Sequence, residues 1–381
     1  MSTPTISLHV WPSRWNLPSY DPPCLAAIIY LQLAIPGKFR VIECRNPDES
    51  PTGQLPFLSH EQHLVASYPS IVKYIAGLRN VDHSTYPNAN LDIHLSRSEK
   101  SQSTAWSAHA ESQLGDLVYH SMYAIEENWS NMTGPALASM FPVPQKYYLP
   151  QRIRVSHYPR LTAAGLWNTP IEEKPAEPAF KRDATPAIST REALLDNVTL
   201  KKRFNREKTI EKSRLVLDLY KEIIPGSYLF HDRLSSSDII IAAHLILLYK
   251  LPYPEPVIKE LLSESYPSLI SYAGGIYDTA FGEGNLPLQL TSDTWSLWSL
   301  LPSKPKQKTH SPTDATNLQE EQQFNRMRWS FFGAVAISLV SYIVIVANQY
   351  EEVLQDIVSQ YSRTTKSQEE EQMQENDDDV A

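Results

Sequence analysis

The sequence contains few of the residues on which several common protein classes depend. Only two of its 381 residues are cysteine, Cys24 and Cys44, which excludes a scaffold built on disulfides and favours a reducing compartment. Its 12 glycines against 29 prolines argue against a glycine-rich nucleotide-binding architecture. The first residues lack a basic stretch followed by an apolar one, so we expect no secretory or matrix-targeting leader.

The chain also lacks an excess of basic residues. Its formal net charge is −9, and residues 351–381 alone hold ten acids against two bases. The preceding residues are therefore close to neutral, and the acidic character belongs to the tail. Because phosphate binding needs a clear basic excess, we expect no nucleic-acid partner. The length suggests about two domains with additional segments.

One long uncharged segment lies near the C-terminus. Residues 329–347 form a run of 19 residues without a charge. A helix of this length rises about 28 Å, which matches the hydrocarbon core of a bilayer. The other apolar run, 238–249, is shorter and contains Asp238 and His244, so we interpret it as a core helix. We therefore predict one transmembrane helix over 329–348.

The charges beside this segment predict its orientation. Arg326 and Arg328 precede it, whereas residues 351, 352 and 356 after it are acidic. Basic residues favour the cytosolic side, so we expect a cytosolic head and an acidic tail, 349–381, across the membrane. Small residues form one helical stripe that suits close approach of a partner helix or barrel wall: Ser330, Ala334, Ser338 and Ser341. Random placement of small residues explains this stripe equally well.

The N-terminal part carries an alternation of strand and helix patterns. Residues 6–11 alternate as a strand does, and Asp21 with Pro22 opens an apolar helix that stops at residues 36–37. Ser67 offers a cap for a helix through residue 75. Further strands are expected at 39–44, 55–59 and 63–66. This order predicts a thioredoxin-like domain over residues 1–90.

From residue 91 onward, helical patterns replace the strand patterns. Ser235 and Asp238 form a variant capping box before the apolar run. Helices are expected at 103–122, 200–223 and 267–277, within an all-helical domain over 91–285. Residues 142–190 contain eight prolines and are predicted to be a loop insertion. Residues 286–328 are predicted to contain a flexible linker.

A thioredoxin-like half followed by an all-helical half resembles the glutathione transferase fold. The matching residues are 53–58, 67–76, 228–230, 235–238 and 266–269. In that family the proline matching Pro56 is in cis. The segments 17–21, 46–56, 141–144 and 148–150 resemble metaxins more specifically, and the long proline-rich stretch is similar to that of the fungal metaxin-like subunit. The predicted fold class is α/β plus α, glutathione-transferase-like, with a C-terminal transmembrane helix.

The metaxin resemblance implies a function and a location. It implies a non-enzymatic subunit of the mitochondrial sorting and assembly machinery, in the outer membrane, with its head in the cytosol and its acidic tail in the intermembrane space. There the subunit assists the import, release and insertion of β-barrel precursors. The implied partners are a second metaxin-like subunit, a β-barrel insertase and the lipid bilayer. No cofactor, metal ligand or catalytic residue is expected.

The position of the glutathione site looks degenerate at Leu55, Pro56, Ser67 and Tyr68. Alignment on residues 74–76 places Ser67 and Tyr68 where transferases carry an acid or amide followed by serine. The serine that would hold the γ-glutamyl group is thus replaced by a bulky tyrosine. Cys24 lies in the first turn of a helix, where the macrodipole lowers a thiol pKa, but its apolar surroundings favour a buried core cysteine.

A basic segment supplies a further candidate for partner binding. Residues 201–214 hold seven bases and two acids, beginning with Lys201, Lys202, Arg203 and Arg206. This charge suits an acidic partner such as a receptor of the import translocase, although a solvated helix face explains it equally well. Two other functions also remain open from the sequence: a membrane-anchored glutathione-transferase-like enzyme, and a tether between organelles.

Overall fold

The structure is a computed structural model, and it divides into two units, residues 1–296 and 297–381. The units are described separately. The side chains of Val81, 188–202 and 289–291 are outside the description. The structure describes residues 6–45, 49–82, 84–143, 145–167, 188–224, 226–230, 233–282 and 289–291 of the first unit, and 326, 330, 333 and 337–345 of the second.

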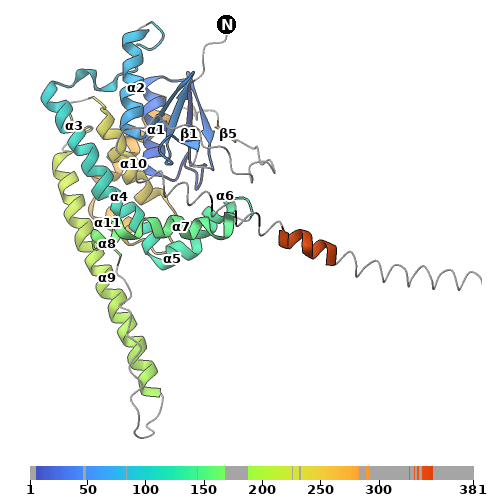
Figure 1. The fold of residues 1–381 in the computed structure, drawn as a ribbon. Helices are drawn as coiled ribbons and strands as arrows, with labels where there is room; N and C mark the ends of the chain where they lie inside the picture. Colours follow the sequence, from blue (N-terminus) through green and yellow to red (C-terminus); the bar gives the residue numbers. More distant parts are fainter. Residues whose placement is uncertain are drawn as a thin grey trace, which may run out of the picture. The chain divides into compact units, whose positions relative to one another are not determined.

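A mixed sheet of five strands forms the N-terminal half, in the order β4-β3-β1-β2-β5 (Figure 1). β1 pairs in parallel with β2 and antiparallel with β3. Ile6, Leu8 and Val10 alternate along β1 and lie in the core, as the sequence pattern predicts. The strands are β1 (Ile6–Val10), β2 (Phe39–Glu43), β3 (Phe57–His60), β4 (His63–Ala66) and β5 (Gln289–Thr291).

The fifth strand corrects the linker prediction. Residues 289–291, which we expected to be part of a flexible linker, pair in parallel with β2. An edge strand presents unpaired backbone N–H and C=O groups, so even a short polar segment gains hydrogen bonds there. Such pairing depends on the backbone of β2, and the composition of 286–328 carries little sign of it.

Helices α1 (Pro22–Ala34) and α2 (Tyr68–Val81) connect and follow the strands. Asp21 caps α1 as predicted, because its carboxylate accepts a hydrogen bond from the backbone N–H of Cys24. Ser67 is the N-cap residue of α2 as predicted, but its hydroxyl donates to the Ser70 hydroxyl and makes no capping hydrogen bond. The order β1-α1-β2-β3-β4-α2 is that of a thioredoxin-like domain.

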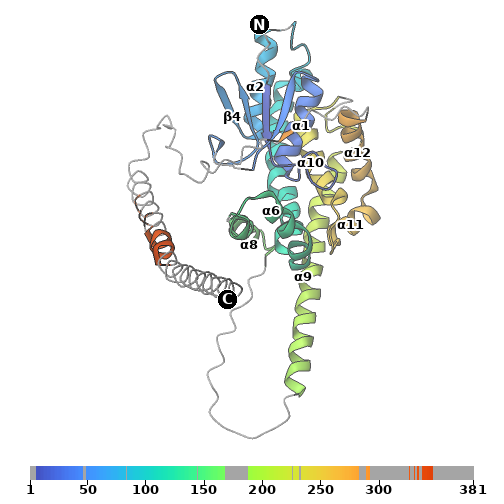
Figure 2. The ribbon, with the colours of Figure 1, turned by 90° about the vertical axis from the view of Figure 1, so that its right-hand side faces the viewer.

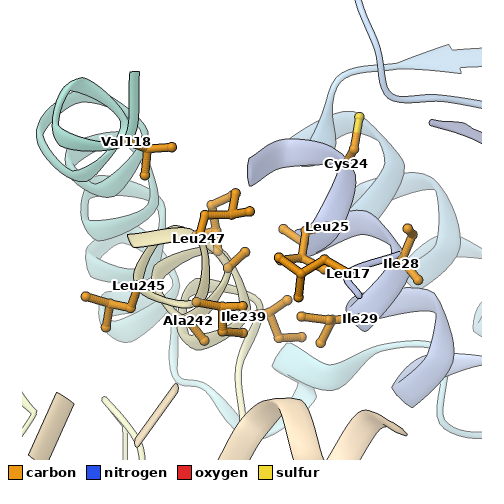
Figure 3. Close-up of a cluster of buried hydrophobic side chains, with 14 of the residues drawn as sticks. Leu17, Cys24, Leu25, Ile28, Ile29, Val118, Ile239, Ala242, Leu245 and Leu247 are labelled. Carbon is orange, nitrogen blue, oxygen red and sulfur yellow. The ribbon is translucent and has the colours of Figure 1, made fainter. Parts of the chain in front are cut away.

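The second half is helical and is built around α10 (Ser236–Lys250), whose residues from Ser236 to Leu248 are buried. Figure 3 shows buried side chains of α1, such as Leu25 and Ile29, beside those of α10, with Val118 on a neighbouring helix. The helices preceding α10 are α3 (Arg97–His109), α4 (Gly115–Tyr119), α5 (Glu126–Asn128), α6 (Gly134–Met140) and α9 (Ile188–Ile223). Those following it are α11 (Val257–Ser265) and α12 (Pro267–Phe281). The core-helix interpretation of 238–249 is confirmed.

Short stretches of other helix types connect these elements. A 3₁₀ turn precedes α3, and three π-helical segments interrupt the run from α3 to α6. The 3₁₀ turns are η2 (Leu91–His94) and η6 (Gln145–Tyr147), and the π segments are η3 (Ala110–Leu114), η4 (His120–Ala124) and η5 (Trp129–Thr133). A π turn leaves backbone carbonyls without their usual partners, which matters for the site below.

The proline-rich insertion is only partly the loop that we predicted. Two helices, α7 (Leu149–Ser156) and α8 (Tyr158–Ala163), lie within 142–190, and α9 begins at Ile188. Pro150 and Pro159 occupy the first turns of α7 and α8, where a missing N–H costs nothing. Proline content therefore marked helix starts in this stretch. Residues 168–187 lie outside the described residues.

The second unit contributes one described stretch of helix, 337–345. Each residue in it is exposed, including Ile337, Leu339 and Val340. No helix among the described residues is long and apolar enough to cross a membrane. Most of the predicted transmembrane helix 329–348, and the whole tail 349–381, lie outside the described residues.

Candidate functional site

The start of α1, where a transferase would activate a thiol, is closed in this protein. Cys24 and Tyr20 are buried there, beside the half-buried Asp21. Burial raises the pKa of the Cys24 thiol well above its usual value, and the neighbouring Asp21 carboxyl raises it further. Burial also raises the pKa of Asp21 to about 6. Desolvation thus outweighs the helix macrodipole, and the interpretation of Cys24 as a core cysteine is confirmed.

We expect neither cysteine to react in the native protein. Cys24 is fully buried and Cys44 is 2% exposed, and neither forms a disulfide. A thiol-specific chromogenic reagent at neutral pH should label almost nothing until denaturant is added, when two thiols per chain should react. A native-state reaction at Cys24, abolished by Cys24→Ala and not by Cys44→Ala, would contradict this description.

The predicted degenerate glutathione position forms one connected group. The Leu55–Pro56 peptide bond is cis, as the family resemblance implies. The backbone N–H of Ser67 donates to the Pro56 carbonyl oxygen over 3.2 Å. Tyr68 follows directly and is 3% exposed. The structure therefore brings Leu55, Pro56, Ser67 and Tyr68 together at the start of α2.

Tyr68 contacts the helical half of the protein. Its hydroxyl donates to the backbone oxygen of Ser236 over 2.7 Å, across 168 positions of sequence. The carboxylate of Asp92 accepts bonds from the Ser236 backbone N–H and hydroxyl, at 2.8 and 2.6 Å. Tyr30 packs edge-on against the Tyr68 ring. The side chain that replaces the glutathione-binding serine thus joins the two halves at the start of α10.

Aromatic side chains fill the region beside the start of α1. His157 of the α7–α8 turn stacks against the rings of both Tyr119 and Tyr123, at centroid distances of 4.5 and 4.4 Å. Phe141 packs edge-on against Trp11, with centroids 6.4 Å apart. Trp11 also packs against Tyr20, so aromatic side chains of both halves lie near the start of α1.

Two arginines hold the α7–α8 segment in place. Arg160 donates to the Asp116 carboxylate over 2.6 Å and to the carbonyl oxygens of Glu111 and Ser112, which belong to the π segment η3. Arg154 donates to the Tyr123 carbonyl oxygen. Each guanidinium thus donates to backbone carbonyl oxygens of a π segment.

Sequence reasoning missed these two arginines and the segment that they hold. It treated 142–190 as a loop, and so it gave Arg154, His157 and Arg160 no role. The signal available in the sequence was the position of Pro150 and Pro159, each one residue inside a short apolar-periodic stretch. Which carbonyls the arginines would satisfy depended on π turns that no sequence pattern indicated.

The predicted partner-binding residues lie elsewhere. In α9, Arg203 is exposed and Arg206 forms an exposed ion pair with Glu260 at 3.2 Å, while the side chains of Lys201 and Lys202 are outside the description. Figures 1 and 2 both show the N-terminal part of α9 extending away from the rest of its unit. In the second unit, Ser330, Ser338 and Ser341 are exposed, and Ala334 lies outside the described residues.

Buried histidines give the head a predicted pH dependence. Burial lowers the pKa values of four histidines to about 4: His9, His120, His157 and His244. Between about pH 6.5 and pH 4 the unfolded chain binds protons at these sites that the folded chain does not, so stability falls as the pH falls. Asp21 acts in the opposite direction below pH 6, because its folded pKa is raised.

We therefore expect the free energy of unfolding to fall between pH 6.5 and pH 4.5. These groups together correspond to a release of up to about three protons on folding near pH 5. Urea unfolding at successive pH values measures the slope. His157→Phe keeps an aromatic ring against Tyr119 and Tyr123. In this variant the pH slope of the free energy of unfolding should be smaller by the equivalent of about one proton. A flat profile over this range would contradict the prediction.

Residues 24–154 match a family model described as outer mitochondrial membrane transport complex protein. Metaxin-1 of Sus scrofa is 27% identical over 184 residues, covering 48% of this chain and 55% of the relative. Metaxin-3 of Xenopus laevis is 30% identical over 148 residues, covering 39% and 45%. The chain thus spans about half the length of these two curated relatives. A metaxin-1 homolog of Drosophila melanogaster is 22% identical over 318 residues, covering 83% and 81%.

Solved structures similar to this chain include two fungal glutathione transferases. One, from Ceriporiopsis subvermispora in complex with glutathione, is 14% identical and covers 72% of this chain and 97% of its own, with a TM-score of 0.45. The other, from Phanerochaete chrysosporium, is 15% identical and covers 74% and 98%, with a TM-score of 0.44.

The topology and the closed thiol position define a class. A thioredoxin-like half followed by a helical half is a glutathione-transferase-like fold, and here Tyr68 and Cys24 are both buried. Residues 24–154 are in addition similar to an outer mitochondrial membrane transport complex family, and the chain is similar to metaxins over part of its length.

Proposed function

We propose that this protein is a non-enzymatic subunit of a transport complex in the mitochondrial outer membrane. The observation that carries the proposal is the family match over residues 24–154, the stretch that contains the closed thiol position. The Tyr68 hydroxyl donates its hydrogen bond to the Ser236 carbonyl oxygen, and Cys24 is fully buried. Neither group is therefore placed to bind or activate glutathione. This arrangement disfavours the alternative of a glutathione-dependent enzyme.

We further propose that residues 329–348 anchor the protein with its head in the cytosol and its acidic tail in the intermembrane space. The support is the run of 19 uncharged residues and the exposed apolar side chains of 337–345. A helix that is apolar on every side needs an apolar environment on every side. Protease added to intact mitochondria should then digest the head, and protection of the head would reverse the proposed orientation.

The specific role that we propose is assistance in the import, release and insertion of β-barrel precursors. The partners would be a second metaxin-like subunit and a β-barrel insertase, with the stripe at Ser330 and Ser338 and the basic segment of α9 as candidate contacts. Newly imported barrel proteins should assemble more slowly in mitochondria that lack this chain, as followed by native electrophoresis.

Variants separate this role from enzymatic activity. Returning the chain with Cys24→Ala should restore assembly to the level of the unmodified chain, because the thiol has no role in the proposal. Detergent-solubilised protein should not be retained on glutathione resin. Unchanged assembly kinetics without the chain, or conjugation activity lost in Cys24→Ala, would refute the proposal.

A further inference from the structure

Exposed apolar side chains gather in one short stretch of the head. Eight large apolar side chains are exposed in the described part of the first unit, and four of them lie within residues 143–155: Val143, Tyr147, Tyr148 and Val155. Tyr147 is 74% exposed. Scattered exposed apolar residues are normal, whereas a contiguous group marks an interaction surface.

The fold places these side chains together. Tyr148, Arg152 and Val155 follow the helical spacing i, i+4, i+7 and so share one face of α7 and its N-terminal residue. Lys146 lies over the Tyr147 ring, with Nζ 4.9 Å from the ring centroid. An open pocket of about 590 Å³ adjoins them, with Phe141 and Pro142 in its lining. We name this surface the tyrosine patch: Val143, Lys146, Tyr147, Tyr148, Arg152 and Val155.

The stretch of sequence that carries the tyrosine patch contains basic residues and no acidic ones. Residues 128–171 contain no aspartate or glutamate and four bases. Two of the bases, Arg154 and Arg160, form ion pairs with Glu126 and Asp116. The other two, Lys146 and Arg152, belong to the patch itself. Its character is therefore aromatic, aliphatic and cationic.

We propose that the tyrosine patch docks the head onto an anionic lipid headgroup surface. Tyrosine rings favour the interface between water and hydrocarbon. Lysine and arginine extend their charged ends to lipid phosphates while their stems cover apolar surface. An acidic protein would offer the same charge, but five of the six patch side chains are exposed and the pocket beside Val143, Lys146 and Tyr147 is open, so the patch suits a broad surface better than a single partner side chain.

The inference rests on the proposed membrane anchor, which keeps the patch near the bilayer. Residues 292–328, between β5 and the proposed anchor, would span roughly 33 Å root-mean-square as a random coil. Such a tether gives the head a high effective concentration at the membrane surface. A surface of modest affinity is then sufficient to hold the head in one orientation.

The test uses the full chain reconstituted into phosphatidylcholine vesicles with and without phosphatidylinositol. A bimane label is attached to Tyr147→Cys or, as the control, to Phe204→Cys on α9, which is 67% exposed. Cys24 and Cys44 are buried and should not be labelled. Lipids brominated near the headgroup should quench the label at position 147 in the anionic vesicles, and should leave the label at position 204 unquenched.

Charge variants test the chemistry of the patch. Lys146→Gln and Arg152→Gln should each shift the docked-to-undocked ratio about fivefold towards undocked, whereas Arg203→Gln on α9 should not shift it. Equal quenching at positions 147 and 204 would overturn the proposal. Patch variants that keep normal quenching yet lose barrel-protein assembly would also overturn it, and would indicate a protein partner.

Failure of the anchor is distinguishable from failure of the patch. If alkaline extraction releases the reconstituted chain, the proposed transmembrane anchor is wrong. Flotation of the full chain with anionic vesicles then reports on the patch alone. Flotation that Lys146→Gln weakens about fivefold supports the docking surface without the anchor. Flotation that Lys146→Gln leaves unchanged, or an absence of flotation, refutes it.

Discussion

Replacing Asp238 with alanine is expected to lower the free energy of unfolding by about 4 kcal/mol. The carboxylate of Asp238 is fully buried and accepts bonds from the Leu229 backbone N–H at 2.7 Å and the Tyr272 hydroxyl at 2.8 Å. It also accepts from the backbone N–H of Ser235, which completes the capping box of α10. Alanine would leave these donors buried without acceptors. Urea unfolding of the detergent-solubilised chain measures the loss.

The chain supplies a matched control for this prediction. Ser96 and Glu99 form a second complete capping box, at the start of α3, and it is exposed. Because water satisfies the donors that it loses, Glu99→Ala should cost only about 0.5–1 kcal/mol. Similar losses for Asp238→Ala and Glu99→Ala would show that burial of the α10 cap contributes nothing, against the structure.

The second large effect is expected at Tyr68. Tyr68→Ala should cost about 4 kcal/mol, because it empties a buried aromatic position and removes the bond to Ser236. Tyr68→Phe keeps the packing against Tyr30 and loses only the hydrogen bond, so about 1 kcal/mol is expected. Denaturant unfolding of both variants separates the contribution of packing from that of the hydroxyl.

Tyr68 also tests the interpretation of the closed thiol position. If Tyr68 is structural, Tyr68→Ala should expose new protease sites where the two halves meet and should gain no retention on glutathione resin. A stable Tyr68→Ala protein that binds glutathione would show that the tyrosine blocks an otherwise intact site. That result would favour the enzymatic alternative over a transport subunit.

Local signals predicted the elements whose formation depends on nearby residues. The cap at Asp21, the capping box at Ser235 and the alternation of β1 all formed where expected, because each depends on contacts within a few positions. The segment 142–190 was predicted less well. Its prolines read as loop residues, yet Arg160 and His157 fix α7 and α8 onto the helices before them.

The degenerate site was predictable in part. That Tyr68 stands where a transferase carries serine is visible in the sequence, and so is the apolar setting of Cys24. That the Tyr68 hydroxyl binds the Ser236 carbonyl oxygen could not be predicted, since the two residues are 168 positions apart and no pattern pairs them. The same holds for the stack of His157 against Tyr119 and Tyr123.

The sequence by itself indicated the order of the strands and helices from β1 to α2, the tyrosine at position 68 and the separation of an acidic tail from a near-neutral head. Those properties follow from composition and from short-range periodicity. The tertiary structure decided that Cys24 is buried, that His157 beside α7 and α8 stacks on Tyr119, and that β5 extends the sheet. Each depends on desolvation or on hydrogen bonds between distant segments, which exist only after the chain has folded.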